Sequence, residues 1–175
     1  MCWSFNRQYG CRFLAIMPTN LYGRGDNYDL ESSHVLPALM RKIHEARRSG
    51  ARQVSIWGSG TPRREFLYAD DLAGAAVFLA DLDEPRFAAL TDPQTCPTIN
   101  VGTGEDQTIL EVAGEIAQVV GFEGEFVLDR SRPDGTLRKV LDVSRMRALG
   151  WSPRTPLREG LEYAYDDFLG GKVRR

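Results

Sequence analysis

The sequence predicts an α/β fold, because patterns typical of strands and of helices alternate along the chain. Residues 12–17 contain an unbroken apolar run and predict a buried strand. Apolar residues then recur with helical spacing between residues 32 and 50, and a second strand-like run covers residues 53–57. The same succession of strand and helix returns from residue 98 onward. Alternation of this kind is typical of α/β proteins.

The composition indicates an ordinary globular protein. The chain has 175 residues, of which 42% are hydrophobic and 26% charged, and its net charge is −2. Positive and negative residues are mixed along the chain, which argues against nucleic-acid and membrane partners. No apolar run approaches the ~20 residues that a membrane span needs. The first residues are too polar for a signal peptide, so we expect a cytoplasmic protein.

The cysteines predict neither a disulfide framework nor a metal site. Cys2, Cys11 and Cys96 are odd in number and widely spaced, and no C-x-x-C motif is present. We therefore expect reduced thiols and no bound metal.

Residues typical of helix ends place the first two helices. The opening residues predict the last turns of a helix that is closed by Gly10. Ser32 or Ser33 is expected to cap the next helix, which Gly50 ends. The strand at residues 53–57 then leads into a glycine-rich turn.

The middle of the chain repeats this succession of strand and helix. Residues 65–68 are expected to be extended, and Asp70 to cap the helix that follows. Residues 98–101 predict another strand. The helix after it carries the capping-box pattern of Thr108 and Glu111.

The last third predicts smaller elements. Strands are expected near residues 125–129 and at residues 138–141. Asp142 is expected to cap a short helix, and Thr155 to cap the final helix with Pro156 in its first position.

Two adjacent arginines follow the glycine-rich turn after residue 57. Successive side chains of an extended segment point to opposite sides, so only one of Arg63 and Arg64 should face a given site. A guanidinium held there could bind a phosphate through two hydrogen bonds. The alternative is that both are surface residues, one of them paired with Glu65 or Asp71.

Three further residues have a functional and a structural interpretation. His34 precedes a predicted helix, where a ligand could reach it, whereas His44 lies within that helix. Imidazole suits proton transfer near neutral pH, but either histidine could serve packing or capping. Trp57 could stack on a nucleobase or fill the core. The turn at residues 102–104 lacks the third glycine of a dinucleotide loop and predicts a tight strand-to-helix turn.

Several stretches together resemble one family. They are NRQYG, MPTNLYG, SSHVLPAL, WGSGTPRREFLYADDLA, INVGTGEDQTI and RPDGTLRKVLDVSRMRALGW. Residues 3–169 thereby resemble the C-terminal half of the GDP-L-fucose synthases, which are extended short-chain dehydrogenases/reductases. The resemblance implies a late Rossmann strand followed by a smaller α/β substrate-binding domain. Residues 1–30 would end the Rossmann domain, and residues 31–175 would form mainly the substrate-binding domain, with some segments returning to the Rossmann sheet.

The resemblance also implies a cofactor site and a catalytic residue. Pro18, Thr19, Asn20 and Leu21 match the stretch that lines the nicotinamide end of an NADP(H) site. His34 matches the acid/base of the family, which lies beside the cofactor. In the family this residue works with a cysteine to move protons at C3 and C5 of a keto sugar.

A GDP-sugar site is implied in the same way. Trp57 and Arg64 match substrate-binding positions, with Arg64 on the diphosphate, and Asp134 and Lys139 fall in the segment that closes over the nucleotide. Lys42 stands where the family has an arginine that contacts substrate. Lysine keeps the charge but lacks the two-pronged geometry of arginine. The family is homodimeric, largely through helices of its other half, so we do not extend that expectation to this chain.

The other catalytic motifs of the family are absent from this sequence: the glycine-rich phosphate loop, a serine, a cysteine and a Tyr-x-x-x-Lys pair. The complete enzyme would convert GDP-4-keto-6-deoxy-D-mannose to GDP-L-fucose by 3,5-epimerisation and NADPH-dependent 4-reduction. We expect these 175 residues alone to be inactive. The alternatives are a non-catalytic GDP-sugar-binding module, half of a split enzyme, another nucleotide-sugar epimerase or dehydratase, or a remnant that folds poorly.

Overall fold

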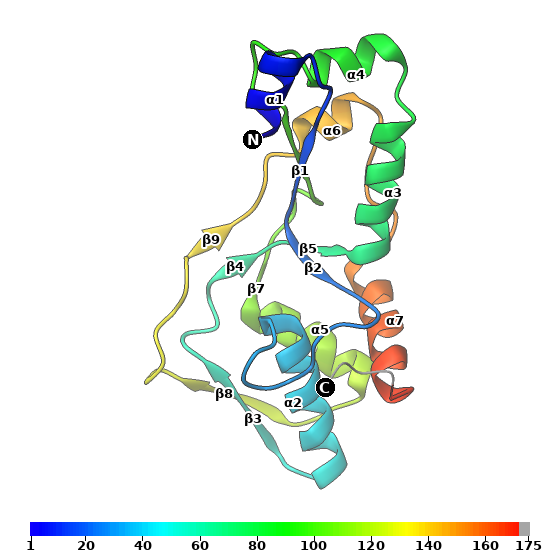
Figure 1. Ribbon diagram of the computed structural model, residues 1–175. Helices are drawn as coiled ribbons and strands as arrows, with labels where there is room; N and C mark the ends of the chain where they lie inside the picture. The colour runs from blue at the N-terminus through cyan, green and yellow to red at the C-terminus, as the bar shows by residue number, and fades with distance from the viewer. Residues whose placement is uncertain (172–175) are drawn as a thin grey trace.

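The computed structural model describes residues 1–171 and shows an elongated α/β chain whose helices gather at two ends (Figure 1). The helices are α1 (Cys2–Tyr9), α2 (Val35–Ser49), α3 (Ala69–Ala80), α4 (Glu84–Leu90), α5 (Ile109–Val120), α6 (Ser144–Ala148) and α7 (Leu157–Leu169). The strands are β1 (Ala15–Pro18), β2 (Asn20–Tyr22), β3 (Gln53–Trp57), β4 (Arg63–Arg64), β5 (Phe66–Tyr68), β6 (Thr98–Val101), β7 (Gln107–Thr108), β8 (Glu125–Asp129) and β9 (Arg138–Lys139).

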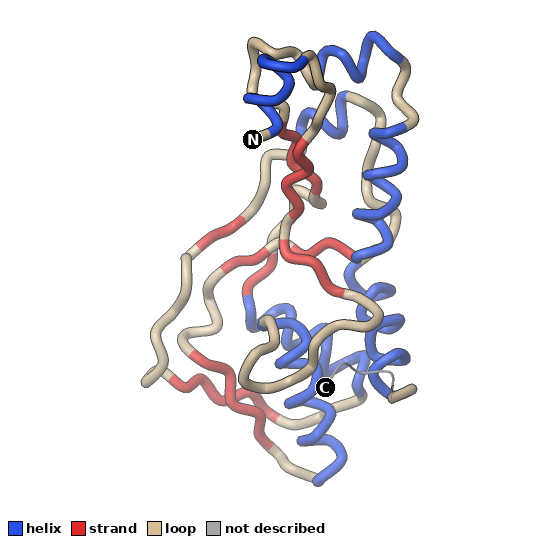
Figure 2. The backbone as a smooth tube through the Cα atoms, viewed as in Figure 1, coloured by secondary structure: helices blue, strands red, loops and turns tan. Residues whose placement is uncertain are grey.

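The described strands pair in small groups, which extend from the upper centre of the molecule to its lower left in Figure 2. Three parallel pairs form: β1 with β6, β2 with β5, and β3 with β8. A three-stranded group places β4 between β7, which is antiparallel to it, and β9, which is parallel. The strands of this last group have only two residues each. Backbone pairing alone therefore contributes little to holding it together.

One hydrophobic core, here called the upper core, surrounds the β1–β6 pair. Helices α1, α3, α4 and α6 lie around these strands in the upper part of Figure 1. Parallel strands need cover on their faces, and the apolar residues of α3 and α6 supply part of it. The buried residues of the upper core are Leu67, Ala75, Leu79, Leu90, Ile99, Val101 and Met146.

A larger hydrophobic core, the lower core, lies between the β3–β8 pair and helices α2, α5 and α7. Strand β3 alternates exposed and buried residues, so Val54 and Ile56 face the helices. Helix α2 packs against α5, and α5 against α7. The most deeply buried side chains of these helices are Met40, Ile43, Val112, Ala113, Ile116 and Leu161.

Several predicted helix ends are confirmed. Gly10 and Gly50 close their helices in the left-handed conformation, with φ of 65° and 71°. That conformation is open to glycine because it has no Cβ. The capping box of Thr108 and Glu111 forms with both reciprocal hydrogen bonds.

The caps predicted for α2 and α3 are wrong. His34, not Ser32 or Ser33, is the residue before α2, because the Ser32 hydroxyl donates to the Asp29 carboxylate in the preceding turn. Helix α3 begins at Ala69 and directly follows β5, so Asp70 lies within its first turn instead of before it.

The starts of two later helices also differ from the prediction. Val143 precedes α6, although Asp142 still accepts a hydrogen bond from the Ser144 amide (2.9 Å). Helix α7 starts at Leu157, so Pro156 is the residue before the helix instead of its first residue, and Thr155 lies one residue too early to cap it.

The strand predicted at residues 138–141 ends at Lys139, and β1 runs from Ala15 to Pro18 instead of covering residues 12–17. Helix α4, which Asp83 caps, was not predicted. Among residues 1–171, no helix is both long and apolar enough to cross a membrane.

Candidate functional site

A cavity of about 500 Å³ lies between the start of α2, strand β3 and the loop after β8. Four residues of the predicted substrate site line it: Lys42 from α2, Trp57 at the end of β3, Arg64 from β4, and Asp134 from the loop. Apolar residues of α2 and β3 form the floor of the cavity. Its size is that of sites which hold small-molecule ligands.

Trp57 offers an exposed aromatic face at the mouth of this cavity. The side chain is 57% exposed, which excludes its interpretation as a core residue. The Lys42 ammonium lies 4.5 Å from the centre of the ring, and the Arg132 guanidinium lies 5.0 Å from it. Partial burial lowers the pKa of Lys42. The aromatic face can stack on a planar ring such as a nucleobase, and the two cations beside it can attract an anionic group such as a phosphate.

The two adjacent arginines have different surroundings. Arg64 lines the cavity, and its guanidinium donates to the carbonyls of Arg63 and Thr136. Arg63 instead forms an ion pair with Asp106, with 2.7 Å between Nε and Oδ1. Asp106 also binds Arg138, and both arginines hold the pKa of this carboxylate below its usual value.

The suggested pairing of an arginine with Glu65 or Asp71 is wrong. The Glu65 carboxylate accepts hydrogen bonds from the amides of Gly104 and Leu141, each at 2.8 Å. Asp71 accepts from the Thr155 amide at 2.9 Å. Both acids therefore connect segments that are distant in the sequence.

Asp134 secures the loop that covers the cavity. Its two carboxylate oxygens accept from the Ser59 amide (2.8 Å) and hydroxyl (2.7 Å), and these bonds lower its pKa. The Asp134 carboxylate also lies so close to the backbone of Gly58, where φ is +78°, that a Cβ at Gly58 would overlap one of its oxygens. Lys139 is exposed and lies opposite Arg64 in the β4–β9 register, outside the cavity lining.

The residues expected at the cofactor form a fixed junction between β1 and β2. Thr19 is buried, and its hydroxyl donates to the Glu65 carbonyl (3.3 Å). The Asn20 amide donates to the same carbonyl at 2.7 Å. Leu21 packs against the upper core, and Pro18 is exposed. The junction lies at the carboxyl end of a parallel strand, which is where α/β sheets bind dinucleotides.

The two histidines have different roles in the structure. His34 is exposed at the start of α2 and is not part of the cavity lining. Burial raises the pKa of nearby Asp26, an effect that His34 partly opposes. His44 is partly buried beside the lower core, where its Nδ1 is 3.0 Å from the Tyr165 hydroxyl and its ring packs on Phe168. Burial lowers the pKa of His44, so a packing role fits it.

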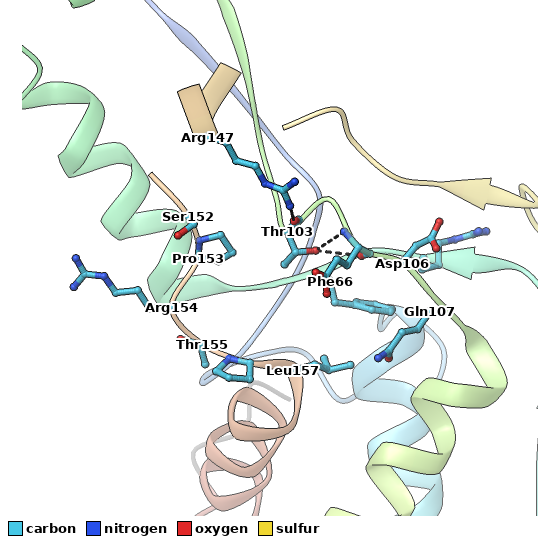
Figure 3. A pocket seen from close by; sticks show the side chains of 13 residues that line it. Phe66, Thr103, Asp106, Gln107, Arg147, Ser152, Pro153, Arg154, Thr155 and Leu157 are labelled. Atoms are coloured by element: carbon cyan, nitrogen blue, oxygen red, sulfur yellow. Dashed lines mark hydrogen bonds between the residues drawn. The ribbon is translucent and has the colours of Figure 1, made fainter. Parts of the chain in front are cut away.

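A second cavity, of about 460 Å³, also has Arg64 in its lining (Figure 3). Residues 102–104 form the tight turn expected from the sequence, and Arg147 donates to the Thr103 carbonyl. In Figure 3, Arg154 projects away from Asp106. The Glu65 carboxylate, which sequence reasoning did not identify as a site residue, fills the space beneath the turn. Its position directly before the strand-forming residues 66–68 was the available signal.

Comparison with known proteins identifies relatives over nearly the whole chain. A family model described as "NAD dependent epimerase/dehydratase family" matches residues 1–89. A GDP-L-fucose synthase of Escherichia coli is 49% identical over 174 residues, which are 99% of this chain and 54% of that protein. The chain thus spans about half the length of the curated relatives it matches.

Solved structures agree with this result. A GDP-6-OMe-4-keto-L-xylo-heptose reductase from C. jejuni superposes with a TM-score of 0.81 at 34% identity, over 98% of this chain and 57% of that one. A GDP-L-fucose synthetase from Naegleria fowleri bound to NADP gives 0.77 at 29% identity, over 96% and 48%. The expected resemblance and the α/β fold of the extended short-chain dehydrogenase/reductase type are both confirmed.

Proposed function

This chain belongs to the NAD dependent epimerase/dehydratase family, and on that premise we propose that it forms the C-terminal, GDP-sugar-binding part of an NADP(H)-dependent GDP-L-fucose synthase. The observation that carries the proposal is the meeting of Lys42, Trp57 and Arg64 in one cavity of nucleotide size. Relatives that bear the name GDP-L-fucose synthase support the choice of substrate. The reaction would be the conversion of GDP-4-keto-6-deoxy-D-mannose to GDP-L-fucose by the complete enzyme.

In this proposal the cavity holds the GDP part of the substrate. The base stacks on Trp57, and Lys42 lies close enough to the ring to contact the base or a phosphate. Arg64 binds the diphosphate, because its guanidinium lines the cavity while that of Arg63 is bound to Asp106. Asp134 holds the covering loop through Ser59, and Lys139 flanks Arg64 from the neighbouring strand.

His34 is proposed as an acid/base for epimerisation. Its imidazole is exposed at the end of the segment that joins β2 to α2, outside the nucleotide cavity, where a sugar extending from the diphosphate could reach it. Protons beside a keto group are acidic enough for a positioned imidazole to remove and return. Exchange at C3 and C5 requires such a group.

The junction of β1 and β2 is proposed to line the nicotinamide end of NADP(H). The exposed Pro18 lies at the carboxyl end of β1, and the hydrogen bonds of Thr19 and Asn20 fix the backbone beside it. These residues therefore fit a bound dinucleotide. The cofactor, when bound, would supply the hydride for C4; this chain would orient it through Pro18, Thr19, Asn20, Leu21 and His34.

The division of the chain follows from the same proposal. Residues 1–30 would complete a Rossmann domain, and residues 31–175 would form mainly the substrate-binding domain. The pairing of β6 with β1 in the upper core supports the return of later segments to the Rossmann part. We further propose a cytoplasmic location, since the three cysteines are free thiols.

Calorimetric titration with GDP tests the proposal. The wild-type chain should bind GDP more tightly than UDP. Arg64→Ala should weaken GDP binding at least tenfold, because a charge-assisted phosphate contact is lost. Arg63→Ala is the matched control and should change the affinity less than threefold. Absence of GDP binding by the wild-type chain would overturn the proposal. Equal effects of the two variants would mean that Arg64 is not the arginine that binds the diphosphate. Equal affinities for GDP and UDP would favour another nucleotide-sugar epimerase or dehydratase.

A further inference from the structure

Glu65 is a fully buried carboxylate at the centre of the site region. It lies between β4 and β5 and is 0% exposed. Acidic side chains are almost never fully buried unless their charge is compensated. Within residues 1–171, the hydrogen-bond partners of this carboxylate are the amides of Gly104 and Leu141, each at 2.8 Å, and the Thr103 hydroxyl at 3.4 Å. Lysine and arginine are not among these partners.

These partners lie in the segments beside the two strands that flank β4. Gly104 precedes β7, and Leu141 follows β9, so the carboxylate joins the segments on both sides of the strand that carries Arg64. In the same group, Asp106 binds Arg63 and Arg138. Because each strand has only two residues, these side-chain carboxylates add connections that the short backbone ladders do not supply.

The backbone of Glu65 connects the same point to the proposed cofactor junction. Its carbonyl accepts from the Asn20 amide at 2.7 Å and from the Thr19 hydroxyl at 3.3 Å. The packing beneath the turn at residues 102–104 leaves no spare room. A Cβ at Gly102 would overlap the Glu65 Oε1 atom.

We infer that Glu65 is a positioning residue for the phosphate-binding Arg64. Its carboxylate fixes the segments around Arg64, and its carbonyl connects them to Asn20 at the junction of β1 and β2. The inference rests on the proposed function. The Arg64 guanidinium donates to the Thr136 carbonyl, and residues 136–139 are in turn held by the bond from Leu141 to Glu65. Loss of that bond releases the segment against which Arg64 is oriented.

The test replaces Glu65 by glutamine, whose NH₂ group faces one of the two amides, that of Gly104 or that of Leu141, with a donor where an acceptor is needed. GDP and guanosine are titrated separately by calorimetry. Glu65→Gln should weaken GDP binding at least tenfold and leave guanosine binding within twofold, since Trp57 and Lys42 lie on β3 and α2. Ile116→Ala, in the lower core, is the control for lowered stability and should leave the ratio of the two affinities unchanged.

Hydrogen exchange provides a readout that does not need GDP. In Glu65→Gln, amides of residues 19–22 and 136–142 should exchange at least tenfold faster, while those of β3 and β8 remain as in the wild type. Unchanged hydrogen exchange in Glu65→Gln would overturn the inference. An equal loss of GDP and guanosine binding, which is expected of a merely structural residue, would also overturn it. A wild-type chain that binds no GDP would overturn the proposed function instead, and hydrogen exchange would still decide the role of Glu65.

Discussion

Gly102→Ala should destabilise the protein by displacing the Glu65 carboxylate. The new Cβ would overlap Oε1 and lie 2.9 Å from the carboxyl carbon. Gly102 is not among the glycines with positive φ, so alanine brings no backbone strain of its own. The expected effect therefore comes from the contact with Glu65.

The magnitude follows from the hydrogen bonds that the carboxylate makes. Movement of Glu65 leaves the amides of Gly104 and Leu141 without their charged acceptor. A hydrogen bond to a charged group contributes about 1.5–3 kcal/mol, so the loss of two should lower the free energy of unfolding by about 3 kcal/mol or more. With a urea m-value of about 2 kcal/mol per molar, the midpoint should fall by about 1.5 M.

Urea titration followed by circular dichroism measures this change. Gly74→Ala is the matched control: Gly74 lies inside α3, and a methyl group added there would meet no atom within 4 Å. That variant should gain about 0.5–1 kcal/mol, because alanine has the better helix propensity. In a double-mutant cycle, Gly102→Ala should add almost nothing in a Glu65→Ala background. A loss below about 1 kcal/mol, or fully additive losses, would refute the reasoning.

Three further predictions concern the histidines and the isolated chain. His34→Asn should leave GDP affinity within twofold, because His34 lies outside the cavity lining. It should abolish deuterium exchange at C3 and C5 of the keto sugar, measured by NMR, once the N-terminal half of a relative is supplied; unchanged exchange would remove His34 from the mechanism. The purified chain alone should not oxidise NADPH in the presence of GDP-4-keto-6-deoxy-D-mannose, and spectrophotometric turnover would contradict this expectation. The folded state lowers the pKa of His44, so the unfolded chain binds the proton more readily. Stability should therefore fall as pH decreases below about 6.5, the ordinary histidine pKa. In denaturation experiments, the free energy of unfolding of His44→Gln should depend less on pH in that range. An unchanged slope of this free energy against pH would exclude His44 as the source of the dependence.

Local signals in the sequence predicted the features whose partners are near in the chain. Gly10 and Gly50 end their helices as expected, because a left-handed terminal residue is a property of a few neighbouring residues. The capping box of Thr108 and Glu111 is equally local. The cap of α2 was missed because the Ser32 hydroxyl was already bound to Asp29, a competition that side-chain preferences alone do not settle.

The features that depend on distant partners could not be predicted in this way. In the sequence, Glu65 is one charged residue next to an extended segment. Only the fold brings Gly104 and Leu141 to its carboxylate. The same is true of Asp134 and Ser59. Alternation along β4 did separate the two arginines, but the ion pair that holds Arg63 away from the cavity comes from a later segment.

The order of the strand pairs also has a consequence for how the chain is made. Ribosomes release the polypeptide from its N-terminus, yet Ala15 pairs with Thr98 and Gln53 with Glu125. The β1–β6 pair therefore cannot form until β6 has been synthesised, and the β3–β8 pair cannot form until β8 has emerged. Contacts between such distant segments slow folding and lengthen the time for which unpaired strand edges are exposed. Nascent chains are consequently expected to depend on protection from aggregation until β8 has left the ribosome.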